Sequence, residues 1–214
     1  MKLRTTLAWL VMAACCAVAA LTSPARAQSQ IEPEGEPNTV ILVAAPNLAE
    51  PVYQQTVLIV TAIEGGRFIG IMLNRPTRRS LSSLFPEHSP SKAVVEPVFF
   101  GGPMSRSAVF ALAKSQQGAG AGSIPLMKNL YLAITVNVVD KVIEETPNDA
   151  RYYVGNVLWR PGELQDEIRR GVWTVHTADP DIVFNKDPTH LWEEMSRMAR
   201  GVVASASLEA LLPR

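Results

Sequence analysis

The chain has 214 residues, 20 basic and 20 acidic side chains, and a mean hydropathy of +0.09. A chain of this length predicts one folded domain with a substantial core. The even balance of charge excludes the strongly basic footprint of a protein that binds polyanions, so we expect no nucleic-acid partner.

The first residues have the pattern of a secretory signal peptide, which we assign to residues 1–27. Lys2 and Arg4 precede an uncharged apolar run at residues 7–21, and Ala25-Arg26-Ala27 places small residues where signal peptidase cleaves. The apolar run is shorter than the roughly 20 residues of a bilayer-spanning helix, so we expect no permanent membrane anchor. An uncleaved anchor and a lipoprotein attached through Cys15 stay open as alternatives.

Cleavage after Ala27 would leave a mature chain that begins at Gln28. Both cysteines, Cys15 and Cys16, would be removed with the leader, so we expect no disulfide and no cysteine metal site. Removal of three basic residues and no acidic one leaves 17 basic against 20 acidic side chains, a net charge of −3. We therefore expect a periplasmic or secreted protein.

Residues 28–38 are polar, acidic and interrupted by proline, which predicts a flexible linker. The folded domain is expected over residues 39–204, followed by a C-terminal tail at 205–214. Three runs rich in β-branched residues predict strands, and their near-continuous hydrophobicity predicts that both faces of these strands are covered. The three runs are residues 39–46, 56–63 and 68–74, and Glu64-Gly65-Gly66-Arg67 predicts a hairpin connection between the last two.

Beyond Pro76 the pattern changes. Residues 80–87 predict a short helix that is capped by Ser80 and stopped at Pro86. Residues 97–102 and 108–113 return to strand composition, and the glycine-rich residues 116–123 predict a flexible loop rather than a dinucleotide fingerprint.

The last third of the chain predicts helices at residues 138–145, 162–173 and 190–203, since apolar side chains recur there at helical spacing. The expected apolar faces are Leu164, Ile168 and Val172 in the second helix, and Leu191, Met195 and Met198 in the third. Strands that are mixed with a few helices, without regular alternation, predict the α+β class.

The stretch VFFGGPMSRS, residues 98–107, poses the first functional question. Gly101 can adopt a positive φ, whereas Pro103 pushes Gly102 toward extended geometry. The pair predicts a sharp exit from a strand, with backbone amides open to a ligand, although Pro103 supplies no N–H. We interpret the diglycine primarily as a turn that reverses the chain, and secondarily as a candidate anion-binding site.

Several spaced segments together resemble the YqgE/AlgH family, a widespread bacterial family without an agreed biochemical activity. They are APNLAEPVYQQTVLIV, GIMLNRP, FFGGPM, YYVGNVLWRPGELQDEI and the later tryptophan-containing helix, and the resemblance covers roughly residues 40 to 202. It implies a compact α+β domain with a bent or bifurcated mixed sheet flanked by helices. The family name comes from a proposed role in regulating alginate production.

This chain departs from the family pattern in two respects. Arg160 and Glu163 stand where the pattern has glycine and glutamine. Most members also resemble cytosolic proteins without a leader, whereas this chain is expected to be exported. A cytoplasmic regulatory role is therefore in doubt.

Two further turns supply candidate ligand-binding residues. In Asn74-Arg75-Pro76, the amide and guanidinium groups suit a carboxylate or phosphate, although Asn74 more often holds a loop and Arg75 is as often simply solvated. In Trp159-Arg160-Pro161-Gly162-Glu163, an indole beside a helix start suits a small anionic or aromatic ligand. The structural interpretation is a core tryptophan, with Glu163 balancing the helix dipole.

Residues for catalysis and for metal binding are scarce in the sequence. His88, His176 and His190 are widely separated, and a metal site of His176 with Asp179 and Asp181 is weak, so we expect no metal and no cofactor.

The leading hypothesis is a non-catalytic binding or regulatory accessory protein of the cell envelope. It binds an unknown protein segment or a small anionic ligand, and its candidate site residues are Asn74, Arg75, Gly101, Gly102, Trp159, Arg160 and Glu163. The alternatives are an enzyme for a small anionic substrate, with Glu163 as base, and a transcriptional regulator as the family name suggests.

The predicted leader can be tested directly. We expect mass spectrometry of fractionated cells to find a chain that begins at Gln28 outside the inner membrane, because the small residues before Gln28 permit cleavage there. A chain that keeps Met1, or one that carries a lipid on Cys15, would contradict this expectation.

Overall fold

The structure, a computed structural model, describes residues 39–114 and 120–198. The predicted signal peptide at 1–27, the linker at 28–38 and the tail at 205–214 lie outside these ranges. Within the described residues, none of the helices has both the length and the apolar character that a membrane crossing requires.

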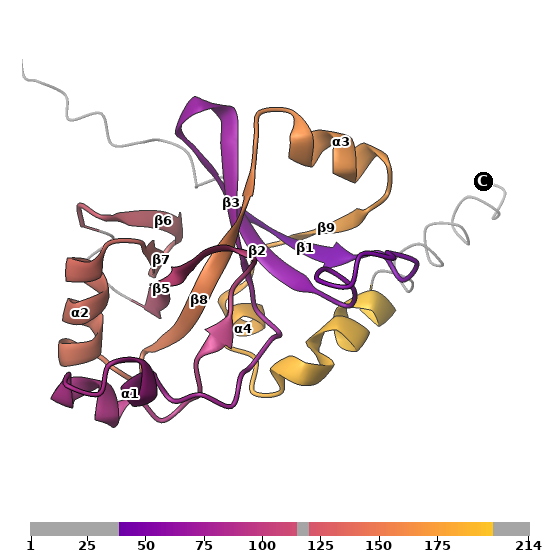
Figure 1. Cartoon of the computed structure of the whole chain (residues 1–214). Helices are drawn as coiled ribbons and strands as arrows, with labels where there is room; N and C mark the ends of the chain where they lie inside the picture. Colours follow the sequence, from indigo (N-terminus) through magenta and orange to yellow (C-terminus); the bar gives the residue numbers. More distant parts are fainter. Residues whose placement is uncertain (1–38, 115–119, 199–214) are drawn as a thin grey trace, which may run out of the picture. The chain divides into compact units, whose positions relative to one another are not determined.

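One curled, mostly antiparallel sheet organises the described residues (Figure 1). Its strands are β1 (Thr39–Ala44), β2 (Val57–Ile63), β3 (Arg67–Met72), β4 (Phe99–Phe100), β5 (Met104–Lys114), β6 (Ser123–Met127), β7 (Leu130–Ala133), β8 (Ala150–Trp159) and β9 (Trp173–Thr177). The order is β6-β7-β5-β8-β3-β2-β1-β9, and β4 pairs with β8 beside this path. Since β4 and β8 run parallel and the sheet carries a few helices, the α+β class is supported.

Short helices connect and cover the strands. They are α1 (Leu81–Leu84), α2 (Val136–Glu145), α3 (Glu163–Arg169), α4 (Pro180–Val183) and the 3₁₀ turns η1 (Glu64–Gly66), η2 (Ser89–Ala93) and η3 (Pro188–His190), and residues 191–198 are also helical. The predicted cap of the first helix is confirmed, because the Ser80 hydroxyl accepts the Ser83 N–H at 3.2 Å. Figure 1 shows α2 beside β5 to β7, and α3 near β9.

The first five strands and the hairpin correspond to predicted elements, but β6 to β9 do not. The predicted helix over 162–173 is wrong in its last part, because α3 ends at Arg169 and Gly171 turns the chain with φ 72°. Trp173 then begins β9 and pairs with Ala44. Of the predicted loop at 116–123, residues 116–119 lie outside the described residues. Ser123, its last residue, is the first residue of β6.

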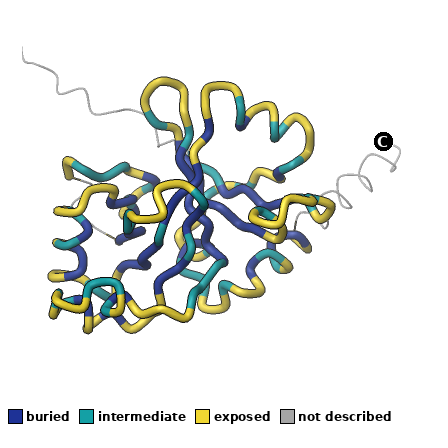
Figure 2. The backbone as a smooth tube through the Cα atoms, in the orientation of Figure 1, coloured by how far each residue is buried: buried dark blue, intermediate teal, exposed yellow. Residues whose placement is uncertain are grey.

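The predicted burial of both strand faces is confirmed for β1 to β3. On β1, Ile41 and Val43 pack into a core with Leu191 and Met195, while Leu42 packs on the other face. That second face is covered by α3 and by the loop between β1 and β2. Figure 2 shows these strands buried and the hairpin at 64–66 exposed.

The final helix departs from its predicted apolar face. Leu191 and Met195 are buried as expected, but Met198 is 52 % exposed. Trp192 and Ser196 instead share the inward side, so the buried face is rotated along the helix and leaves Met198 at its rim.

The diglycine carries the chain across β8, so the predicted chain reversal is confirmed. β4 pairs parallel with β8 at Tyr153, whereas β5 pairs antiparallel with β8 from Met104 onward. At the crossing, a Cβ on Gly101 would overlap the Gly155 carbonyl oxygen, and a Cβ on Gly102 would overlap the Asn156 backbone. The positive φ expected at Gly101 occurs at Gly102 instead, where φ is 153°.

We expect Gly101→Ala to lower the free energy of unfolding by about 1–3 kcal/mol, because the added methyl group forces the crossing apart. Urea unfolding of the purified chain measures the loss. Gly120→Ala is the matched control, since nothing lies within 4 Å of a Cβ at that position. Equal unfolding midpoints for the two variants would contradict this account of the crossing.

Candidate functional site

A pocket of about 370 Å³ lies where the chain leaves β3. We call it the Arg75 pocket. Phe100 N–H donates to the Arg75 carbonyl at 2.8 Å, so the Asn-Arg-Pro turn lies directly beside the strand that leads to the diglycine. The lining residues are Gln55, Asn74, Arg75, Pro76, Thr77, Phe100, Thr189, Trp192 and Glu193.

Asn74 is a positioning residue in this pocket. Its side chain is buried, its Oδ1 accepts the Val57 N–H at 3.0 Å, and its Nδ2 donates to the Gln55 carbonyl at 2.8 Å. Gln55 has a φ of 51°, an unusual conformation for a residue with a side chain, and the Asn74 amide holds it. The loop-holding interpretation of Asn74 therefore accounts for its contacts.

Arg75 differs from Asn74 because its hydrogen-bonding capacity is incompletely used. The side chain is half-buried, and Nη2 donates to the Gln54 carbonyl and, at 3.2 Å, to the Thr56 hydroxyl. No ion pair joins Arg75 to an acidic side chain within the described ranges. Burial lowers the pKa of Arg75.

The diglycine does not line the pocket. Gly101 N–H donates to the Val154 carbonyl at 2.8 Å, and the Gly101 carbonyl accepts the Met72 N–H at 2.9 Å. The expected opening of the Gly101 amide to a ligand is therefore wrong, because that donor already joins β4 to β8. Gly101 and Gly102 instead position Phe100, which reaches the pocket.

Trp159 and Glu163 lie in a separate, smaller cavity of about 110 Å³, which we call the Trp159 pocket. Its lining residues are Leu48, Glu50, Tyr53, Val157, Leu158, Trp159, Glu163, Glu167, Val172 and Trp173. Four of the predicted site residues are thus divided between two pockets, and Gly101, Gly102 and Arg160, whose side chain is 87 % exposed, line neither.

Glu167 organises the Trp159 pocket, and the candidate set from the sequence does not contain it. One oxygen, Oε2, accepts the indole N–H of Trp159 at 2.9 Å and that of Trp173 at 2.7 Å. Both indoles are nearly buried. Glu163, the first residue of α3, accepts the Arg160 backbone N–H at 2.9 Å, which closes the turn before the helix. This leaves an acidic side chain in the first turn, where the helix dipole favours it.

The division of residues bears on the enzyme alternative. That mechanism needs Arg75, the diglycine amides and Glu163 around one substrate. Arg75 and Glu163 line different pockets, and the Gly101 N–H is occupied. The structure therefore does not assemble this catalytic set.

Candidate metal-binding residues are also apart. In residues 39–114 and 120–198, no group of three or more His, Asp or Glu side chains is arranged to hold a metal ion. The Asp179 carboxylate instead accepts the Asp181 N–H at 2.8 Å at the start of α4.

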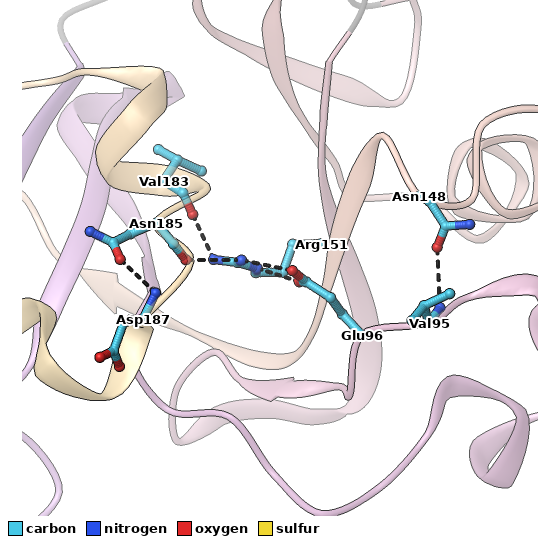
Figure 3. A network of polar contacts seen from close by, with 7 residues as sticks. All are labelled: Val95, Glu96, Asn148, Arg151, Val183, Asn185 and Asp187. Carbon is cyan, nitrogen blue, oxygen red and sulfur yellow. Dashed lines mark hydrogen bonds and ion pairs between the residues drawn. The ribbon is translucent and has the colours of Figure 1, made fainter.

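A buried arginine that the sequence reading did not single out ties distant segments together (Figure 3). Arg151 is 3 % exposed and donates to both Glu96 carboxylate oxygens, at 2.7 and 3.0 Å. It also donates to the Val183 carbonyl at 2.9 Å and the Asn185 carbonyl at 3.2 Å. Burial, the largest single effect, lowers the pKa of Arg151, but the hydrogen bonds and charges of Glu96 and Tyr153 together outweigh burial and the pKa is raised. Arg151 is therefore a structural residue that joins these segments through four hydrogen bonds.

The comparisons with known proteins agree with this architecture. The AlgH-like family model DUF179 matches residues 41–204. A UPF0301 protein of Streptomyces coelicolor is 29 % identical over 168 residues, which cover 77 % of this chain and 87 % of the relative. A UPF0301 protein of Mycobacterium tuberculosis is 27 % identical over 160 residues, covering 73 % and 79 %.

Two solved structures have a similar fold. A protein of Corynebacterium diphtheriae has a TM-score of 0.61 at 23 % identity, covering 77 % of this chain and 87 % of that chain. The solution structure of AlgH from Pseudomonas aeruginosa has a TM-score of 0.61 at 22 % identity, covering 82 % and 93 %. With the family model matching most of its length, this chain belongs to the AlgH-like DUF179 family.

Proposed function

We propose that this protein is a non-catalytic binding or accessory protein that holds a carboxylate group of a partner protein or small anion in the Arg75 pocket. One observation carries the proposal. A half-buried guanidinium lines an open pocket and has no acidic partner within the described part of the chain. A bound carboxylate would supply the missing charge and accept hydrogen bonds from the planar fork.

The surroundings of Arg75 support a carboxylate with an apolar attachment. Phe100 and Trp192 line the pocket, while Glu193 sets a negative charge at another part of its wall. That carboxylate would repel a multiply charged anion more than a singly charged group. A single carboxylate on an apolar stem, such as an acidic peptide side chain, therefore suits the pocket better than a phosphate.

The place of action follows from the predicted leader. A cleaved signal peptide at residues 1–27 would deliver the domain to the cell envelope, where the partner would be sought. Transcriptional regulation has its basis in the family name, and a mature net charge of −3 opposes attraction to DNA.

The proposal can be tested by nuclear magnetic resonance with glutarate as the carboxylate probe. Trp192 lines the pocket and its indole N–H donates to the Ala44 carbonyl at 2.9 Å, so its cross-peak is a local reporter. We expect glutarate to shift this cross-peak saturably. The neutral diamide, glutaramide, is expected to leave it unchanged because it lacks the charge that Arg75 binds.

Arg75→Ala should weaken glutarate binding about tenfold or more, since a charge-assisted hydrogen bond is lost. Arg75→Lys should give an intermediate affinity, because the charge stays and the fork does not. Arg106→Ala, which removes an exposed arginine on β5, is the control and should bind like the unaltered chain. Equal binding by glutaramide, or undiminished binding by Arg75→Ala, would overturn the proposal.

A further inference from the structure

The Trp159 pocket has a chemistry opposite to that of the Arg75 pocket. Its lining includes three aromatic side chains and three carboxylates, and no Lys, Arg or His. Its volume of about 110 Å³ is small compared with the several hundred Å³ of pockets that hold drug-sized ligands. The cavity therefore suits the end of a side chain or a small head group.

The aromatic walls are held in place by the fold. Trp159 and Trp173 are 4 % and 5 % exposed, and both indole N–H groups are fixed by Glu167. Tyr53 packs edge-on against Trp173, with ring centroids 6.1 Å apart and an interplanar angle of 87°. Rigid aromatic faces that line a cavity attract cations through the ring quadrupole.

The carboxylates make the same cavity electrically negative. Burial raises the pKa of Tyr53, and the charges of Glu50, Glu167 and Glu163 raise it further. Arg160 pairs with Glu163 at 3.7 Å from the exposed side, and no ion pair with Glu50 or Glu167 occurs in the described part of the chain. The phenol thus senses a negative charge that is only partly balanced.

Holding the two indoles does not account for all of this charge. A single oxygen of Glu167 accepts both indole N–H groups. The Glu50 carboxylate is exposed and makes no hydrogen bond within the described residues, so the positions of the indoles do not depend on it. Glu167 holds the two indoles and Glu163 closes the turn before α3, whereas the carboxylate of Glu50 has no such structural contact within the described residues.

We propose that the Trp159 pocket binds the ammonium group of an alkylamine, with the rings of Tyr53, Trp159 and Trp173 as walls and the carboxylates as counter-charge. The three carboxylates alone would not define a binding site for an ammonium group, and the aromatic walls are needed as well. The enclosed aromatic walls select an organic ammonium group over a metal ion, which prefers oxygen ligands all round. This site is separate from the Arg75 pocket and does not rest on the function proposed there.

The indole N–H cross-peaks of the full ¹⁵N-labelled chain provide the test. The probe is choline, and its neutral isostere 3,3-dimethylbutan-1-ol has the same shape without the charge. We expect choline to shift the Trp159 and Trp173 cross-peaks saturably while the Trp192 cross-peak stays in place. Equal shifts with the neutral isostere, or no shift with choline, would overturn the proposal.

Charge variants test the role of the carboxylates. Glu50→Gln combined with Glu163→Gln should weaken choline binding about fivefold, and Glu64→Gln, an exposed acid on the 64–66 turn, is the control that should have no effect. Arg160→Ala should tighten binding about twofold, because Glu163 loses its competing partner. A gain in affinity cannot come from unfolding, so tighter binding of choline by Arg160→Ala would support the proposal. An unchanged or weaker affinity would count against it.

Two further probes identify the source of the ammonium group. N-acetyl-lysine methylamide represents a lysine side chain of a partner protein, and butane-1,4-diamine represents a free polyamine. Tighter binding of the first supports a protein partner, and tighter binding of the second supports a polyamine. Failure of both to shift the Trp159 and Trp173 cross-peaks would overturn the proposal for primary amines.

Discussion

The passage of the chain across β8 is the constraint on which the rest of the structure depends. Gly101 and Gly102 lie on the backbone of Gly155 and Asn156, with no space for a side chain between them. Gly101 also hydrogen-bonds to β3 and β8 at once, so this crossing joins the two parts of the sheet. Because the crossing is fixed, Phe100 and Arg75 come side by side at one pocket.

The loop between β1 and β2 serves both pockets. Tyr53 lines the Trp159 pocket, and Gln55, two residues later, lines the Arg75 pocket. Asn74 and Arg75 hold the Gln55 end through backbone carbonyls, while Trp173 packs against the Tyr53 end. The loop is thus stabilised from β3 on one side and from β9 on the other, and it supplies lining residues to both pockets.

The Arg75 guanidinium lines one pocket, together with Glu193, and the carboxylates of Glu50, Glu163 and Glu167 line the other, although the overall charge of the chain is balanced. Arg75 has no acidic partner, and Glu50 and Glu167 have no basic partner, within residues 39–114 and 120–198. Surface ion pairs elsewhere, such as Lys141 with Glu145, join neighbours on one helix. A half-buried charge without an ionic partner, such as that of Arg75, is costly to maintain, and a ligand of opposite charge would lower that cost.

Local chemistry in the sequence determined the elements that depend on neighbours along the chain. The β-branched runs of β1 to β3, the Ser80 cap and the diglycine reversal could all be predicted, because strand burial, capping and tight turns depend on a few adjacent residues. The start of β9 at Trp173 was hidden at the end of an apparent helical pattern, since Leu164, Ile168 and Val172 also suit a helix although Gly171 turns the chain before Val172. Only the tertiary structure decided that Arg75 and Trp159 belong to different pockets and that Glu167 joins two indoles. Those contacts join segments that are distant in the sequence and that strand pairing brings together. Such contacts produce no periodic pattern in the sequence, so they could not be predicted from it.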